Sequence, residues 1–314
     1  MKTLIIGGNG FIGSHLAEKL LNKGEEVSLL DIVFNSNTSH LNCEKIRGDI
    51  SNIDIVKKAV AGKDVVFHFA AVSRVVWGED DPVNCWRINV MGTANVLEAC
   101  RKTGSNPVVI YASSREVYGE PIYSPVTEDH PKKPKSVYGA SKLAAEHLCA
   151  AYERAFDTKV VILRFSNVYG SERDQLDRVT PKFMLKAMRN EDITLNGGTQ
   201  VLDFCFIDDL ILGLEKLYNK AASGNDDVLG QDFHFATGKG TSVAELAEMI
   251  KKTYQSTSNI RTIDSKSFDV EQFIGDPTKC FKMVGFRATT TLAEGLAILK
   301  ERLISNDVLD KSKL

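Results

Sequence analysis

A tyrosine and a lysine four residues apart, in the segment "SVYGASK", are the first side chains with evident chemical potential. On a helix, Tyr138 and Lys142 lie on one face, which brings an ammonium group close to a phenol. A free tyrosine has a pKa of about 10 and is a poor base at neutral pH, but nearby positive charge favours the phenolate. Tyr138 would then accept a proton from a substrate hydroxyl. The same spacing also fits a tyrosine that packs beside a surface lysine, so other segments must decide.

A glycine-rich segment, "GGNGFIG", directly follows the first apolar run and opens a helical pattern. Gly7 permits a tight turn, Gly10 lets the backbone approach a pyrophosphate at the helix N-terminus, and Gly13 lets helix and strand pack closely. Phe11 and Ile12 lie inside the segment and are further candidates for cofactor contact. A tight loop alone would also use these glycines, but their position between strand and helix predicts dinucleotide binding.

The ends of the next strands supply candidates for the rest of a dinucleotide site. Asp31 ends "SLLD", where a carboxylate accepts hydrogen bonds from ribose hydroxyls and repels a 2′-phosphate, so NAD is favoured over NADP. Asp49 and Ile50 follow the third strand, where an adenine would rest. Ala70 and Ala71 end the fourth strand and are small enough for a cofactor to pass. Each of these last two pairs is also consistent with ordinary packing.

Short β-branched runs alternate with helical patterns over the first half of the chain, which is typical of βαβ units. The strands are apolar on both faces, which predicts a parallel sheet covered by helices on both sides. We therefore expect an α/β fold, a Rossmann-type doubly wound sheet, with residues 1–165 binding NAD. The alternation of strand and helix patterns ends at residue 166. Residues 166–200 and 237–314 are expected to form a smaller substrate-binding region, with 201–236 returning to the first region.

Composition excludes several classes of protein. The chain has 314 residues, 43% hydrophobic and 25% charged, with a net charge of -2, which describes a globular protein without a nucleic-acid partner. The basic run "HPKKPK" is interpreted as a solvated loop. Six scattered cysteines without CxxC spacing indicate neither a zinc site nor a disulfide framework. The first residues are too short for a signal peptide or membrane span. We expect a cytoplasmic protein without a metal or membrane partner.

Several segments together resemble a known family. "GGNGFIG", "FHFAA", "NVMGTANVLEAC", "SSREVYG", "YGASK" and "RFSNVYG" occur in the order and spacing of the extended short-chain dehydrogenase/reductases, specifically the NAD-dependent nucleotide-sugar epimerase/dehydratase family. The resemblance covers nearly the whole chain and is greatest, in overall layout, to the UDP-glucose 4-epimerases. It implies an NAD cofactor, a nucleotide-sugar substrate that is a UDP-sugar, a homodimer, and oxidation of the sugar at C4 to a 4-keto intermediate.

The resemblance also implies roles for individual residues. Ser114 would hydrogen-bond the reacting oxygen, Tyr138 would be the base, and Lys142 would bind the nicotinamide ribose and lower the tyrosine pKa. Asn89 would line the site beneath the nicotinamide, and Asn167 would contact the diphosphate. Further residues beside these motifs complete the predicted site, with Phe69 for the cofactor and Ser73 and Val179 for the substrate. A non-catalytic NAD-binding scaffold would have no need of the serine, tyrosine and lysine together.

The residues after Ser114 bear on which reaction follows. Related 4,6-dehydratases have an aspartate and a glutamate there, whereas this chain has Arg115 and Glu116, and an arginine cannot give up a proton near neutral pH. A 4-epimerase is therefore favoured; a dehydratase or decarboxylase using Glu116 at C5, or a 4-keto-sugar reductase, is the alternative. Glu116 would act at C5, orient a hydroxyl, or pair with Arg115. Neighbours on an extended stretch point to opposite faces, so both are not expected to face the sugar. Arg115 would alternatively bind a substrate carboxylate.

The chain departs from the family pattern where the diphosphate is usually held. Leu202 stands where relatives usually have an arginine. Arg173, Arg178 or Lys182 would supply the charge instead, and Lys266 is the nearest cation in a downstream segment that also lacks a usual arginine. The sequence therefore leaves the nucleotide and the sugar open.

Overall fold

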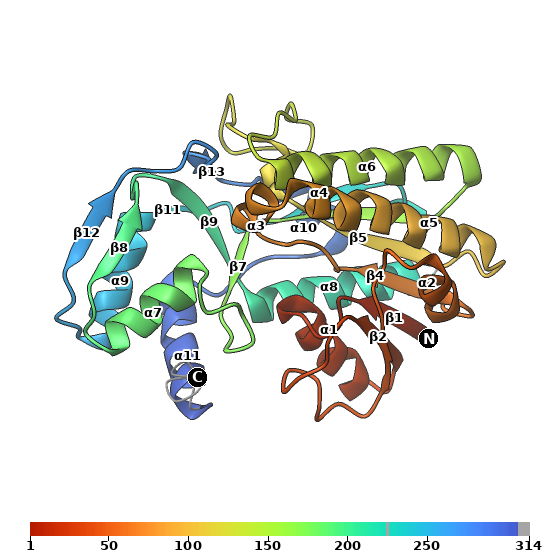
Figure 1. The fold of residues 1–314 in the computed structure, drawn as a ribbon, viewed down its shortest axis with the longest axis horizontal. Coiled ribbons are helices and arrows are strands. Elements are labelled where there is room, and N and C mark those ends of the chain that lie inside the picture. Colours follow the sequence, from red (N-terminus) through yellow and green to blue (C-terminus); the bar gives the residue numbers. More distant parts are fainter. Residues whose placement is uncertain (224–225, 307–314) are drawn as a thin grey trace.

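A seven-stranded parallel sheet forms the centre of the molecule (Figure 1). The computed structural model describes residues 1–223 and 226–306. The strands lie in the order β10-β6-β5-β4-β1-β2-β3, so the chain reverses its direction of travel across the sheet between β1 and β4. In chain order these strands are β1 (Lys2–Ile6), β2 (Glu26–Asp31), β3 (Glu44–Arg47), β4 (Val65–His68), β5 (Val108–Ser114), β6 (Val160–Phe165) and β10 (Asp232–Phe235).

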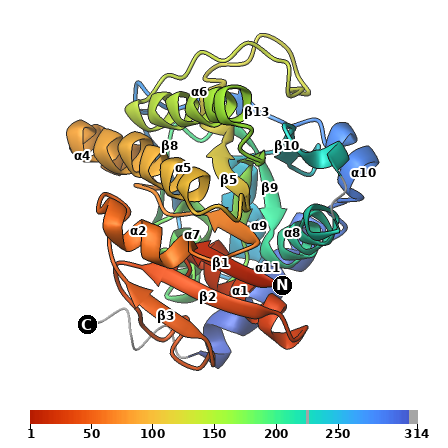
Figure 2. The same cartoon turned by 90° about the vertical axis from the view of Figure 1, so that its right-hand side faces the viewer.

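Helices cover both faces of this sheet (Figure 2). Ile5 of β1 packs in the core on the side of α1 and α8, whereas its neighbours Leu4 and Ile6 pack on the side of α2, α5 and α6. Both faces of the strand are therefore buried, as its continuous apolar sequence requires. These helices are α1 (Phe11–Asn22), α2 (Ile53–Val60), α5 (Thr93–Lys102), α6 (Val137–Phe156) and α8 (Ile207–Ala222). The predicted α/β, doubly wound fold is confirmed.

The helical segment over residues 82–102 is interrupted by a π-helical turn. It consists of α4 (Pro82–Trp86), a π-helix (Arg87–Gly92) and α5, and it follows a short helix, α3 (Val75–Asp80). Asp81 begins α4 by accepting a hydrogen bond from the backbone of Asn84 at 3.0 Å. A π-helical turn contains an extra residue and is often found at functional sites.

A second, smaller region contains two short sheets. β7 (Asn167–Tyr169), β9 (Val201–Phe206), β11 (Gly240–Ser242) and β13 (Gln272–Phe273) form one, and β8 (Ile193–Asn196) pairs with β12 (Ile260–Ile263) in the other. Its helices are α7 (Val179–Met188), α9 (Val243–Tyr254) and α11 (Leu292–Ser305). The expected return of residues 201–236 to the central sheet begins only at α8, because β9 pairs within the smaller sheet. In addition, α10 (Thr278–Val284) packs against β10 and α8.

Some features can be stated only for residues 1–223 and 226–306. None of their helices has both the length and the hydropathy to cross a membrane. The same residues contain no group of three histidine, cysteine, aspartate or glutamate side chains arranged to hold a metal ion. The six cysteines are free thiols.

A buried ion cluster joins the strands that lead to the predicted catalytic residues. Arg164 of β6 makes two hydrogen bonds of 2.9 Å to the carboxylate of Glu146 on α6, and a third contact of 2.6 Å to Asp232 of β10. The Ser113 hydroxyl of β5 donates to the same Glu146 carboxylate at 2.5 Å. Arg164 and Glu146 are almost completely buried. The cluster therefore fixes α6 relative to the ends of three neighbouring strands.

Replacing Glu146 with alanine should destabilise the protein by about 3 kcal/mol or more, because it leaves a buried guanidinium without its bidentate partner. The measurement is urea-induced unfolding followed by circular dichroism. Arg154→Ala, at an exposed position of the same helix, is the matched control and should cost less than about 0.5 kcal/mol. Equal stabilities of the two variants would contradict this role of the cluster.

Candidate active site

A cleft of about 1130 Å³ lies at the carboxyl ends of the central strands, and residues of the smaller region line its other side. Ligands of doubly wound sheets bind at this edge, where the strand order reverses, here between β1 and β4. The cleft is larger than most sites for one small molecule, which leaves room for a cofactor and a substrate together.

The glycine-rich segment forms the part of the cleft at the N-terminus of α1. Gly7 has a φ of +81°, and a Cβ on it would lie 2.6 Å from the backbone nitrogen of Ala70. A Cβ on Gly13 would lie 2.3 Å from the Gly7 carbonyl oxygen, so both positions require glycine. Gly10 lines the cleft, and a Cβ there would meet only the Gly7 carbonyl oxygen, at 3.2 Å. The backbone at the positive end of α1 is thus open to a pyrophosphate.

Asp31 lies at the end of β2 and lines the neighbouring part of the cleft. Its carboxylate accepts a hydrogen bond of 2.9 Å from the backbone nitrogen of Asn9, and burial raises the pKa of Asp31. Asn9, Asn35 and Asn37 also line the cleft here, and the sequence did not single them out. The polar run "FNSNTS" that follows Asp31 is the signal that could have found two of them. This end of the cleft can hold an adenosine.

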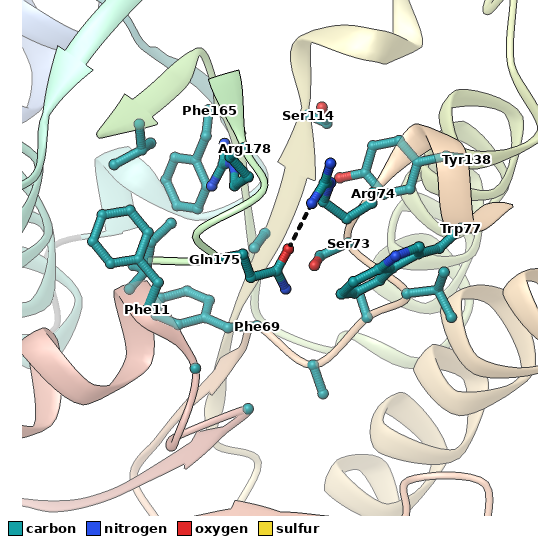
Figure 3. A pocket seen from close by; sticks show the side chains of 18 of the residues that line it. Phe11, Phe69, Ser73, Arg74, Trp77, Ser114, Tyr138, Phe165, Gln175 and Arg178 are labelled. Atoms are coloured by element: carbon teal, nitrogen blue, oxygen red, sulfur yellow. Dashed lines mark hydrogen bonds between the residues drawn. The ribbon is translucent and has the colours of Figure 1, made fainter. Parts of the chain in front are cut away.

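Ser114 and Tyr138 line the cleft (Figure 3), and Lys142 is also among its lining residues. Ser114 ends β5, and Tyr138 lies in the first turn of α6, which begins after Ser136 caps it by accepting from the Gly139 backbone at 3.0 Å. Burial raises the pKa of Tyr138 to about 12, while a hydrogen bond from Ser114 opposes this shift. Burial lowers the pKa of Lys142 to about 8. A buried phenol, a hydroxyl and a readily titrated ammonium suit proton transfer to and from a bound substrate.

The contacts of Lys142 differ in part from those that the sequence predicts. Its ammonium donates a hydrogen bond of 2.9 Å to the carbonyl oxygen of Ala112 on β5 and lies 5.1 Å from the ring centroid of Tyr111. The groups that chiefly lower the pKa of Tyr138 here are Ser114 and the Arg178 guanidinium. The effect of Lys142 on the Tyr138 pKa stays a prediction.

A family model described as the NAD dependent epimerase/dehydratase family matches residues 3–230. The chain belongs to this family. The prediction of NAD as cofactor is thereby confirmed, and the glycine segment, the open backbone at Gly10 and the carboxylate of Asp31 fit that cofactor.

Relatives within the epimerase/dehydratase family have more than one activity. The chain is 37% identical over 255 residues to a putative UDP-glucose 4-epimerase of Methanocaldococcus jannaschii, covering 79% of this chain and 81% of that protein. It is 30% identical over 311 residues to UDP-glucuronic acid decarboxylase 6 of Arabidopsis thaliana, covering 96% and 88%. The structure of UDP-glucuronic acid 4-epimerase from Bacillus cereus, in complex with UDP-glucuronic acid and NAD, superimposes with a TM-score of 0.88 at 30% identity, covering 98% and 100%.

Arg115 and Glu116 form an ion pair at 2.9 Å. The expectation that they point to opposite faces is wrong, because the chain is not extended here: Arg115–Val117 form a 3-10 turn capped by Ser114. Both residues line the cleft. The Arg115 guanidinium also lies 5.8 Å from the ring centroid of Phe273. The pair therefore forms part of the cleft wall beside Ser114.

Asn89 does not line the cleft, contrary to the expectation from the resemblance. Its side chain is 1% exposed. The amide accepts a hydrogen bond from the backbone nitrogen of Val72 at 2.8 Å, donates to the Val72 carbonyl oxygen at 3.1 Å and donates to Ser141 at 2.9 Å. The π-helical turn directs this side chain into the protein, where it holds the loop after β4. Asn89 is thus a positioning residue in this structure.

The other predicted residues line the cleft, and their contacts with ligands stay predictions. They are Gly7, Gly10, Phe11, Ile12, Gly13, Asp31, Asp49, Ile50, Phe69, Ala70, Ala71, Ser73, Ser114, Arg115, Glu116, Tyr138, Lys142, Asn167 and Val179. They come from loops far apart in the sequence that meet at one edge of the sheet.

The cations predicted to replace the missing arginine differ in how accessible they are to a ligand. Leu202 is buried in β9. Arg173 and Arg178 line the cleft but each pairs with a carboxylate, at 2.7 Å and 3.2 Å. Lys182 lies outside the lining, whereas Lys266 lines it and, within the described part of the chain, has no carboxylate within salt-bridge distance of its ammonium. Lys266 is therefore the cation most available to a diphosphate.

Replacing Asp31 with serine should weaken NAD binding by about 10-fold, because hydrogen bonds to a charged acceptor are lost. It should also reduce the preference for NAD over NADP, because the carboxylate no longer repels the 2′-phosphate of NADP. Titration of the purified protein with each cofactor, followed by calorimetry, measures both effects. Asp54→Ser, on the exposed side of α2, should leave the ratio of the two affinities unchanged. An unaltered ratio in Asp31→Ser would contradict this assignment.

Proposed function

We propose that this protein is an NAD-dependent nucleotide-sugar 4-epimerase of the UDP-glucose/UDP-galactose 4-epimerase type, acting on a UDP-sugar through a 4-keto intermediate. The observation that carries the proposal is that Ser114 and Tyr138 share one end of the cleft while the neighbouring carboxylate of Glu116 is held by Arg115. The epimerases among the relatives add support.

In this mechanism the chain's own residues move one proton at the C4 oxygen of the sugar. Tyr138, as phenolate, accepts the proton of the C4 hydroxyl, and Ser114 hydrogen-bonds the same oxygen. Bound NAD supplies a two-electron acceptor and donor beside C4. Tyr138 returns the proton when the other face of C4 is reduced, so proton and electrons balance over one turnover. Burial raises the pKa of Tyr138, and the Ser114 hydroxyl and the Arg178 guanidinium oppose that shift. We expect positive charge at Lys142 to favour the phenolate further.

The Arg115–Glu116 pair favours epimerisation over chemistry at C5. A C5 base must reach the proton on C5 of the sugar, and the Arg115 guanidinium, 2.9 Å from the Glu116 carboxylate, occupies one of its oxygens. A decarboxylase or dehydratase is the second candidate, because Glu116 does line the cleft and a decarboxylase is among the relatives. A 4-keto-sugar reductase is a third, distinguished by its need for added reduced cofactor.

The purified protein, without added cofactor, should convert one of a panel of UDP-, dTDP- and GDP-sugars in deuterated water into its C4 epimer. No deuterium is expected at C5, because the only carbon–hydrogen bond that is broken and re-formed is the one at C4. Product analysis by NMR and mass spectrometry measures both. Deuterium at C5, or loss of carbon dioxide or water, would instead support the second candidate.

The matched control for this assay is Tyr138→Phe, which removes the proton-accepting oxygen and keeps the ring. It should lower turnover by at least about 100-fold and leave NAD binding within about twofold of the original. Turnover that survives this substitution would refute the mechanism, even if epimerisation itself is observed.

We also propose that the protein is a homodimer. Apolar side chains are exposed along α4 and the following π-helix, with exposed fractions of 79% for Val83, 44% for Trp86 and 57% for Met91. A second copy of the chain would cover this surface, since exposed apolar clusters commonly mark association sites.

Light scattering after size-exclusion chromatography should give twice the chain mass of 34.6 kDa. A Val83→Glu, Trp86→Glu double variant should shift the protein toward the single-chain mass, because charges would be buried at the contact. Leu212→Glu, at another exposed apolar position, on α8, is the control and should stay dimeric. A single-chain mass for the original protein at micromolar concentration would refute the proposal.

A further inference from the structure

Arg74 spans the cleft from the loop after β4 to the irregular segment before α7. Its guanidinium pairs with Asp177, and its Nη1 lies 3.4 Å from the side-chain oxygen of Gln175 (Figure 3). The guanidinium also lies 5.5 Å from the ring centroid of Trp77. Neither the sequence motifs nor the proposed proton transfer assigns Arg74 a role.

The ion pair across the cleft is unequally buried. The side chain of Arg74 is 17% exposed, whereas that of Asp177 is 64% exposed. An ion pair with one well-solvated partner contributes little, about 0 to 1 kcal/mol, so Asp177 is readily replaced. The guanidinium stays covered by the cleft walls after such a replacement. Arg74 can therefore exchange Asp177 for an anionic group of a bound molecule.

Arg74 is fixed to the wall that carries Tyr138. It immediately precedes α3, and Glu79 of α3 accepts a hydrogen bond of 2.7 Å from the backbone nitrogen of Val137, at the start of α6. Gly78 packs so closely that a Cβ there would lie 3.1 Å from Cβ of Tyr138. Figure 3 shows Ser73, Arg74 and Trp77 on the Tyr138 side, with Gln175 opposite.

A cation beside Tyr138 can contact only those anionic groups of the substrate that lie close to the carbon on which Tyr138 acts. If Tyr138 acts at C4, the diphosphate on C1 lies across the sugar ring from it. Asn167 and Lys266, which line the cleft, are the residues expected to meet that diphosphate. Of the positions close to C4 in a hexose, C6, which is joined to C4 through C5, is the one that can carry a carboxylate, as in a uronic acid. A guanidinium on the Tyr138 wall is therefore placed for a group at C6, and its planar donors match a carboxylate.

We propose that Arg74 is a specificity-determining residue that binds a C6 carboxylate, so that the preferred substrates are nucleotide-linked uronic acids. This inference rests on the proposed function, because the position of C4 comes from it. Arg115, another guanidinium at this end, has a less readily replaced partner: the side chain of Glu116 is 9% exposed, against 64% for Asp177. On binding, Arg74 exchanges Asp177 for the substrate carboxylate.

Calorimetric titration of the NAD-loaded Tyr138→Phe protein with UDP-glucuronic acid and UDP-glucose tests the inference without turnover. The acid should bind at least about 10-fold more tightly. Adding Arg74→Gln should weaken binding of the acid by about 10- to 100-fold, the usual effect of losing a charged hydrogen bond, and change UDP-glucose by less than about twofold. Adding Asp177→Asn instead should strengthen binding of the acid by up to about fivefold, because the competing carboxylate is gone.

Arg87→Gln is the matched control, because it removes another cleft-lining guanidinium, one paired with Asp49. It should leave the ratio of the two affinities unchanged. Arg74→Lys should retain part of the preference for the acid over the neutral sugar, and it replaces Arg74→Gln in the test if the glutamine variant does not fold. Equal binding of acid and neutral sugar, or equal losses for both in Arg74→Gln, would overturn the inference. The product assay fails or succeeds separately, since it reports C4 inversion and not binding preference.

Discussion

The buried pairing of Arg164 with Glu146 is the interaction on which the geometry of the site depends. It connects β6 to α6, and Glu146 also accepts a hydrogen bond from Ser113, the residue directly before Ser114. Ser114 ends a strand and Tyr138 begins a helix, so their separation is set by how α6 lies on the sheet. A buried charge pair specifies that placement more sharply than apolar contacts do, because a shifted helix would leave the guanidinium without its partner.

Local rules in the sequence were sufficient for the parts of the site that depend on backbone geometry. The roles of Gly7 and Gly13 follow from close approaches within one strand-loop-helix unit, and Asp31 ends the adjacent strand. The same local reasoning placed Tyr138 and Lys142 on one face of a helix that the structure contains. These features can be predicted from the order of the strands and the helical repeat, and the pattern of apolar residues indicates both.

Predictions failed where a short irregular turn decides the direction of a side chain. Asn89 faces inward because a π-helical turn interrupts its helix, and Arg115 and Glu116 meet because a 3-10 turn replaces the expected extended chain. The contact between Arg74 and Asp177 joins residues 103 positions apart, so no periodicity in the sequence indicates it. Such contacts arise only when the two regions are assembled.

Several cations of the cleft already have a carboxylate partner, and this bears on how an anionic ligand is selected. Arg74, Arg115 and Arg178 each have a carboxylate partner supplied by the chain, whereas Lys266 lies free of one in the described structure. A ligand anion gains little by replacing a well-buried partner, because the two pairs are nearly equivalent, but it gains more by replacing one exposed to water. The affinity of each cation for the substrate therefore depends on how exposed its carboxylate partner is. By this criterion Asp177, the partner of Arg74, is the carboxylate that a ligand anion replaces most readily.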